Sequence, residues 1–137
     1  MNNRTTIKSF IILVIAALML TACGSPKVSD DHLRYGKKAL SIADDYLKFN
    51  ITAKEAREKM FELYLRADDL PDVDIEDETY RNNFNIEISV SMLHSYLSDL
   101  SLSIDVEKNL NDLKIERNKI AEIIGEDLIE VSEADSQ

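Results

Sequence analysis

Apolar residues recur at helical spacing through the middle of the chain. Between positions 86 and 104 they are four and three positions apart in turn: Ile86, Val90, Leu93, Leu97, Leu100 and Ile104. Residues at these spacings share one face of an α-helix, so the pattern predicts a helix with an apolar stripe. Residues 86–92 also alternate as a strand does, but the alternation stops there and no second strand is available to pair with it. A helix is therefore predicted.

Three further helices are predicted. The first has Asp30 or Asp31 as its N-terminal cap and runs to about Phe49. Its apolar residues form two adjacent stripes that together cover roughly 200° of the helix surface, wider than the usual core-facing stripe. The two stripes comprise Leu33, Gly36, Leu40, Ala43 and Leu47, and Tyr35, Ala39, Ile42, Tyr46 and Phe49. A face this wide either packs between two neighbouring helices or leaves apolar surface for a partner. We interpret it as packing between two helices.

Two more helices complete the prediction. One begins at the capping box of residues 52–55 and ends at Pro71. The other follows a turn near residues 101–105, where the apolar stripe changes phase, and ends at Gly125. Arg117 falls in the stripe of this last helix, where its stem can pack while its charge reaches water.

Only three glycines and two prolines occur in 137 residues, which favours long helices over a sheet with many turns. The predicted fold is all-α: a compact antiparallel bundle of about four helices over residues 30–131, following a cleaved signal segment.

The residues before the predicted bundle are arranged as in a secretory signal peptide, with positive charge followed by an apolar run. Arg4 and Lys8 supply positive charge, and residues 10–20 form an unbroken apolar run of 11 residues. A run this short does not span the roughly 30 Å hydrocarbon core of a bilayer as a helix, but it fits the apolar region of a signal peptide.

The residues Leu20-Thr21-Ala22-Cys23 resemble the lipobox of bacterial lipoproteins. The resemblance implies a signal peptide at residues 1–22, cleavage between Ala22 and Cys23, and lipid on Cys23. Residues 23–29 would then be the lipidated tether, and two or more acyl chains give stable membrane binding. The implied location is the outer face of a bacterial cell membrane, or an outer membrane where the host has one. Cys23 is the only cysteine, so no disulfide forms within the chain.

Charge and motif content narrow the class of function. Without Arg4 and Lys8, the mature chain has 14 basic and 26 acidic residues and a net charge of −12. Such a chain repels phosphate backbones, so no nucleic-acid partner is expected. The sequence has no phosphate-binding loop and no Cys-Cys or His-His metal spacing, and His32 and His94 stand far apart. We therefore expect no catalytic residues, no metal site and no cofactor.

Three apolar residues lie off the predicted stripes. Phe61 and Leu65 point away from the stripe of the second helix, and Ile115 points away from that of the fourth. These residues are the candidate partner patch, although a third or fourth helix covering Phe61 and Leu65 is an equal alternative. The leading hypothesis is a non-enzymatic interaction module for an envelope or extracellular protein partner. The oligomeric state is left open.

Other functions remain open. Asp72, Asp74 and Glu76 alternate in an acidic connector and suggest a cation- or ligand-binding module, but Asp77 and Asn83 stand where an EF-hand loop has Gly and Glu. In size, anchor and helicity the chain is similar in outline to prophage-encoded lipoproteins that block incoming phage DNA. A self-associating structural protein of the envelope is a further class. The acidic residues 132–137 are predicted to form a C-terminal tail.

Overall fold

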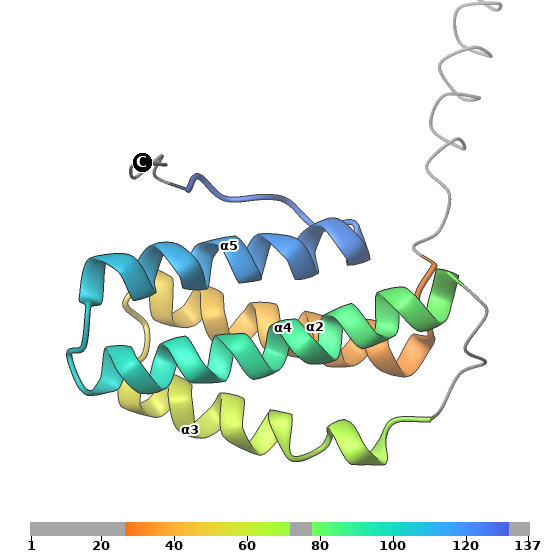
Figure 1. The fold of residues 1–137 in the computed structure, drawn as a ribbon, viewed down its shortest axis with the longest axis horizontal. Helices are drawn as coiled ribbons and strands as arrows, with labels where there is room; N and C mark the ends of the chain where they lie inside the picture. Colours follow the sequence, from red (N-terminus) through yellow and green to blue (C-terminus); the bar gives the residue numbers. More distant parts are fainter. Residues whose placement is uncertain (1–26, 72–77, 132–137) are drawn as a thin grey trace, which may run out of the picture.

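The computed structural model describes residues 27–71 and 78–131, which form a bundle of four antiparallel α-helices (Figure 1). The elements in chain order are α2 (Asp30–Leu47), α3 (Ala53–Tyr64), the short 3-10 helix η1 (Ala67–Asp69), α4 (Glu78–Ser101) and α5 (Val106–Ile124). The predicted all-α bundle is confirmed. No helix in the described part combines the length and apolarity needed to cross a bilayer.

Several predicted features lie outside the described residues. They are the signal segment 1–22 with its cleavage site, the lipidation site Cys23, the acidic connector residues Asp72, Asp74 and Glu76, and the tail 132–137.

The helix ends follow local capping chemistry. Ser29, rather than Asp30 or Asp31, caps α2, and its hydroxyl accepts the His32 amide at 3.3 Å. The predicted capping box at Thr52 is confirmed, because Thr52 and Glu55 each accept the other's backbone N–H. Gly125 ends α5 at a φ of 76°, which confirms the predicted C-terminal cap.

One predicted helix boundary was wrong, and two predicted apolar stripes run past the ends of their helices. The first helix ends at Leu47, because Phe49 adopts a left-handed φ of 60° that a helix does not tolerate. The second ends at Tyr64, well before Pro71, and continues only as η1. The third ends at Ser101, which confirms the predicted turn near residues 101–105. Ile104 lies in this turn, so its predicted place in the buried stripe was wrong.

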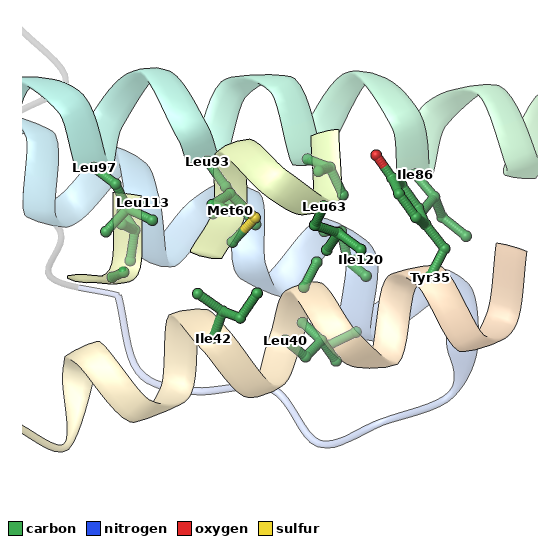
Figure 2. Packing of buried hydrophobic residues seen from close by; sticks show 14 of the residues in the cluster. Tyr35, Leu40, Ile42, Met60, Leu63, Ile86, Leu93, Leu97, Leu113 and Ile120 are labelled. Atoms are coloured by element: carbon green, nitrogen blue, oxygen red, sulfur yellow. The ribbon is translucent and has the colours of Figure 1, made fainter. Parts of the chain in front are cut away.

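The core is formed by one face of each helix, and α2 packs against α3, α4 and α5. Side chains from all four helices converge in Figure 2: Leu40 and Ile42, Met60 and Leu63, Ile86, Leu93 and Leu97, and Leu113 and Ile120. The wide apolar face of α2 is therefore mostly internal. A Cβ added at Gly36 would lie 3.3 Å from the Ile120 side chain and 3.5 Å from those of Ile86 and Ile124, so this glycine allows α2 to approach α4 and α5 closely.

The chain after α5 returns along the bundle as an extended segment, residues 126–131. The Asn118 side chain donates to the Ile129 carbonyl at 2.7 Å and accepts its amide at 2.9 Å. Lys37 on α2 pairs with Glu126 at 3.0 Å. Arg117 is buried and meets Asp44 and the Asp127 carbonyl, so the prediction that its charge reaches water was wrong. Its partners, the Asp44 carboxylate and the Asp127 backbone carbonyl, lie on other elements and replace solvent.

Candidate functional site

Exposed apolar side chains gather at one end of the bundle. Antiparallel order brings the α2–α3 loop and the α4–α5 loop together at this end, on the left in Figure 1, while Lys27 enters at the other end. These two loops and the first residue of α5 carry Phe49 at 92% exposure, Leu102 at 66%, Ile104 at 45% and Val106 at 50%. We call these four side chains the apolar tip. The sequence prediction placed Phe49, Ile104 and Val106 in core-facing stripes, and that was wrong.

Left-handed backbone conformations also gather at the tip. Phe49, Ser103 and Asp105 are the non-glycine residues with positive φ among the described residues, at 60°, 57° and 37°. Such conformations are uncommon for residues with a side chain and cost stability. Strain of this kind persists where the surrounding structure fixes it, and it often accompanies function.

Backbone and side-chain hydrogen bonds hold both tip loops. The Phe49 amide donates to the Tyr46 carbonyl at 3.0 Å, and the Ile104 amide donates to the Asp99 carbonyl at 2.9 Å. The Asn109 side chain, buried on α5, donates to the Ile104 carbonyl at 2.9 Å. The loops therefore present their apolar side chains on a fixed backbone.

The three residues of the predicted partner patch do not lie together. Phe61 and Leu65 are on α3, at 44% and 58% exposure, and Ile115 is on α5 at 37%. Helices α3 and α5 lie on opposite sides of the α2–α4 pair (Figure 1), and each packs against α2 and α4. The patch thus divides into a surface on α3 and a single residue on α5.

The α3 surface includes a small aromatic cluster. His94 of α4 lies 5.2 Å from the Phe61 ring and stacks on Tyr64 at 6.0 Å and 7°. Loss of water around the imidazole lowers the pKa of His94, and the charge of Arg57 lowers it further. His94 is partly buried in this cluster, so a neutral imidazole is the form that suits it.

Polar side chains join the start of α2 to α4 at the opposite end of the bundle, where Lys27 lies. His32 is 2% exposed, with Nδ1 2.8 Å from the Ser29 hydroxyl and Nε2 2.6 Å from Glu87 Oε1. The Ser29 amide donates to the Asn83 side chain at 3.1 Å, and Lys27 pairs with Glu78. Sequence reasoning missed the His32–Glu87 pair, because 55 residues separate the two and no local pattern joins them.

The chain of Ser29, His32 and Glu87 has the residue types of a hydrolase triad, but its geometry favours a structural role. The Ser29 hydroxyl already accepts the His32 amide at 3.3 Å and the Asn83 side-chain amide at 3.3 Å. These two accepted hydrogen bonds occupy both lone pairs of the Ser29 hydroxyl oxygen, so no lone pair is left to attack a substrate. These bonds instead fix the first turn of α2.

The described residues contain no group of three or more His, Cys, Asp or Glu side chains placed to hold a metal ion. The comparisons with known proteins add no family: no family model matches the chain, and no curated protein or solved structure is significantly similar to it.

Proposed function

We propose that the protein is a lipid-anchored bacterial surface protein that acts as a non-enzymatic interaction module and contacts a protein partner through the apolar tip. The observation that carries this proposal is the position of Phe49, Leu102, Ile104 and Val106 at the end of the bundle opposite the tether. Exposed apolar groups that gather on a soluble domain mark interaction sites more often than scattered ones do.

The distance between the two ends supports this orientation. Helix α4 has 24 residues and runs the length of the bundle, which at about 1.5 Å per residue gives roughly 36 Å. Cys23 precedes Lys27 by four positions, a stretch that extends at most about 14 Å. With lipid on Cys23, the clamped end of the bundle lies next to the bilayer and the tip lies far from it.

Charge favours a protein partner over a membrane at the tip. The chain after residue 22 carries a net charge of −12, and anionic lipid headgroups repel such a domain. An apolar partner surface with a neutral or basic rim is complementary to the tip and to the acidic bundle around it. The partner is therefore a protein of the envelope or of the extracellular space.

Co-purification from crosslinked, detergent-solubilised envelopes tests the proposal. The full chain, a tip variant carrying Phe49→Ser and Leu102→Ser, and an α3 variant carrying Phe61→Ser and Leu65→Ser are compared at equal abundance. A protein recovered with the wild type and the α3 variant but lost from the tip variant supports the tip as the contact surface.

An Ile115→Ser variant serves as the control, because this side chain is exposed on another face of the bundle. Equal recovery of every protein with the wild type and the tip variant contradicts the proposal. Loss from the α3 variant alone transfers the contact to the surface of Phe61 and Leu65.

A further inference from the structure

A cavity of about 300 Å³ opens at the tether end of the bundle, far from the apolar tip. It lies among the start of α2, the segment at and after η1, and the first turns of α4. The residues that line it and matter here are His32, Asp68, Tyr80, Asn83, Phe84 and Glu87. Its volume is at the lower end of the range for small-molecule sites, so it suits a small ligand.

The charged side chains among the described residues of this lining are carboxylates. Asp68 and Glu87 face the cavity, and no lysine or arginine of the described lining does. Glu87 Oε1 lies 2.6 Å from Nε2 of His32, whose Nδ1 lies 2.8 Å from the Ser29 hydroxyl. The second carboxylate oxygen of Glu87 accepts no hydrogen bond from the described residues and is available to a ligand.

Aromatic rings form another part of the wall. Tyr80 and Phe84, one turn apart on α4, lie parallel at 6.1 Å and 4°, and Phe84 is 48% exposed. The face of an aromatic ring attracts a cation, and the attraction is strongest where water is partly excluded. Carboxylates and ring faces in one cavity are complementary to a cation with an apolar body.

A buried hydroxyl of α2 lies near Glu87. Tyr35 is 5% exposed, and its hydroxyl makes no hydrogen bond among the described residues. Figure 2 shows this hydroxyl pointing to α4 beside Ile86, the neighbour of Glu87 in the chain. Burial raises the pKa of Tyr35, and the Glu87 charge contributes, so the hydroxyl stays protonated. An unpaired buried donor of this kind is satisfied by a buried water. Tyr35 is not one of the residues that line the cavity, so its hydroxyl is not assigned a contact with the ligand.

We propose that this cavity binds a small organic cation that carries an ammonium group, held by Glu87 and Asp68 and packed against Tyr80 and Phe84. An inorganic divalent cation fits less well, because the described residues provide no cluster of three metal-ligating side chains. The ammonium group belongs either to a free amine or to the headgroup of a membrane lipid, since the cavity is at the tether end. The proposal is independent of the partner contact at the tip.

Calorimetric titration of the full chain in uncharged detergent micelles tests the site, with choline and ethanolamine as probes. Saturable binding of at least one probe at a stoichiometry of one is expected. The neutral carbon isostere of choline, in which carbon replaces nitrogen, is expected to bind at least about tenfold more weakly because the charge interaction is absent. No saturable heat with either amine, or equal binding of the isostere, overturns the proposal.

Variants locate the binding. Glu87→Gln keeps the volume and the acceptor for His32 but removes the charge, and it should weaken binding at least about tenfold. Glu122→Gln, on the exposed side of α5, makes the same change in net charge and should leave the affinity unchanged. Phe84→Ala removes one aromatic ring from the cavity wall and leaves the hydrogen bonds among Ser29, His32 and Glu87 in place. It should weaken binding about two- to fivefold. Equal affinities for the wild type and both Glu87→Gln and Phe84→Ala, each shown by circular dichroism to be folded, overturn the site.

Lipid nanodiscs distinguish the two sources of the ammonium group. If the headgroup is the ligand, phosphatidylethanolamine nanodiscs raise the apparent Kd of choline and phosphatidylglycerol nanodiscs do not. If a free amine is the ligand, neither kind of nanodisc changes the Kd.

Discussion

Arg117 on α5 donates two hydrogen bonds to the carboxylate of Asp44 on α2, from Nε to Oδ1 at 2.9 Å and from Nη2 to Oδ2 at 3.1 Å. The same guanidinium donates through Nη1 to the Asp127 carbonyl in the C-terminal segment. Arg117 is 5% exposed, while the Asp44 side chain keeps 24% of its surface. One side chain thus joins two helices and the segment that follows α5.

Replacing Arg117 with methionine should lower the free energy of unfolding by roughly 2–4 kcal/mol, because it leaves the Asp44 carboxylate and the Asp127 carbonyl without their donor. Urea unfolding followed by circular dichroism measures the change. Lys108→Met is the matched control, since the Lys108 side chain is 72% exposed and water can replace its contact with Asp112, so the pair should contribute little. Equal stability of Arg117→Met and the wild type would show that the ion pair does not hold the bundle.

Phe49→Gly should raise the free energy of unfolding by about 1 kcal/mol, because glycine adopts the φ of 60° without steric cost and the exposed ring loses no burial. Lys48→Gly is the control: its φ is −88°, so it relieves no strain and should slightly destabilise the chain. A loss of stability in Phe49→Gly would contradict the account of a strained tip. If the tip binds a partner, Phe49→Gly should also weaken that contact while stabilising the fold.

Gly36→Leu should lower the free energy of unfolding by about 3 kcal/mol, because the larger side chain has to displace Ile86, Ile120 and Ile124 at the point where three helices meet. Thermal unfolding measures the loss. Ser41→Leu, on the exposed side of the same helix, adds similar apolar volume without a clash and serves as the control. Similar melting temperatures for the two variants would refute close packing at Gly36.

The pH dependence of stability should carry a contribution from His94. Its pKa is lowered in the folded chain, so the unfolded chain binds more protons below the ordinary pKa of 6.5. The stabilising contribution of the neutral imidazole is present above about pH 6.5 and is lost as the pH falls through the folded-state pKa. Urea midpoints of the wild type and of His94→Phe at pH 7.5 and 5.5 measure the effect. The variant should lose less stability on acidification, and parallel losses would exclude His94 as a cause.

Local pattern was enough to predict much of this fold. The spacing of Ile86, Val90 and Leu93 reported a helix face, and the caps at Thr52 and Gly125 follow from side-chain chemistry within a few residues. Each of these features depends on neighbours in the chain, which a single sequence displays directly.

The features that sequence reasoning missed depend on distant contacts or on unusual backbone. Phe49, just after α2, has a left-handed conformation, which is usually adopted by glycine or asparagine. A phenylalanine at this position gives no sign of it in the sequence. His32 can be buried because Glu87 on another helix pairs with it, and Arg117 can be buried because Asp44 on another helix pairs with it. The tip and the cavity arise from the antiparallel arrangement of whole helices, so they become visible only in three dimensions.

The intact mass of the chain purified from bacterial membranes tests the lipid anchor most directly. We expect a polypeptide that begins at Cys23 and carries the added mass of a diacylglycerol group, while Cys23→Ser retains its leader. A full-length chain with an unmodified thiol, or a product found in the cytosol, would contradict the anchored arrangement and with it the outward orientation of the tip.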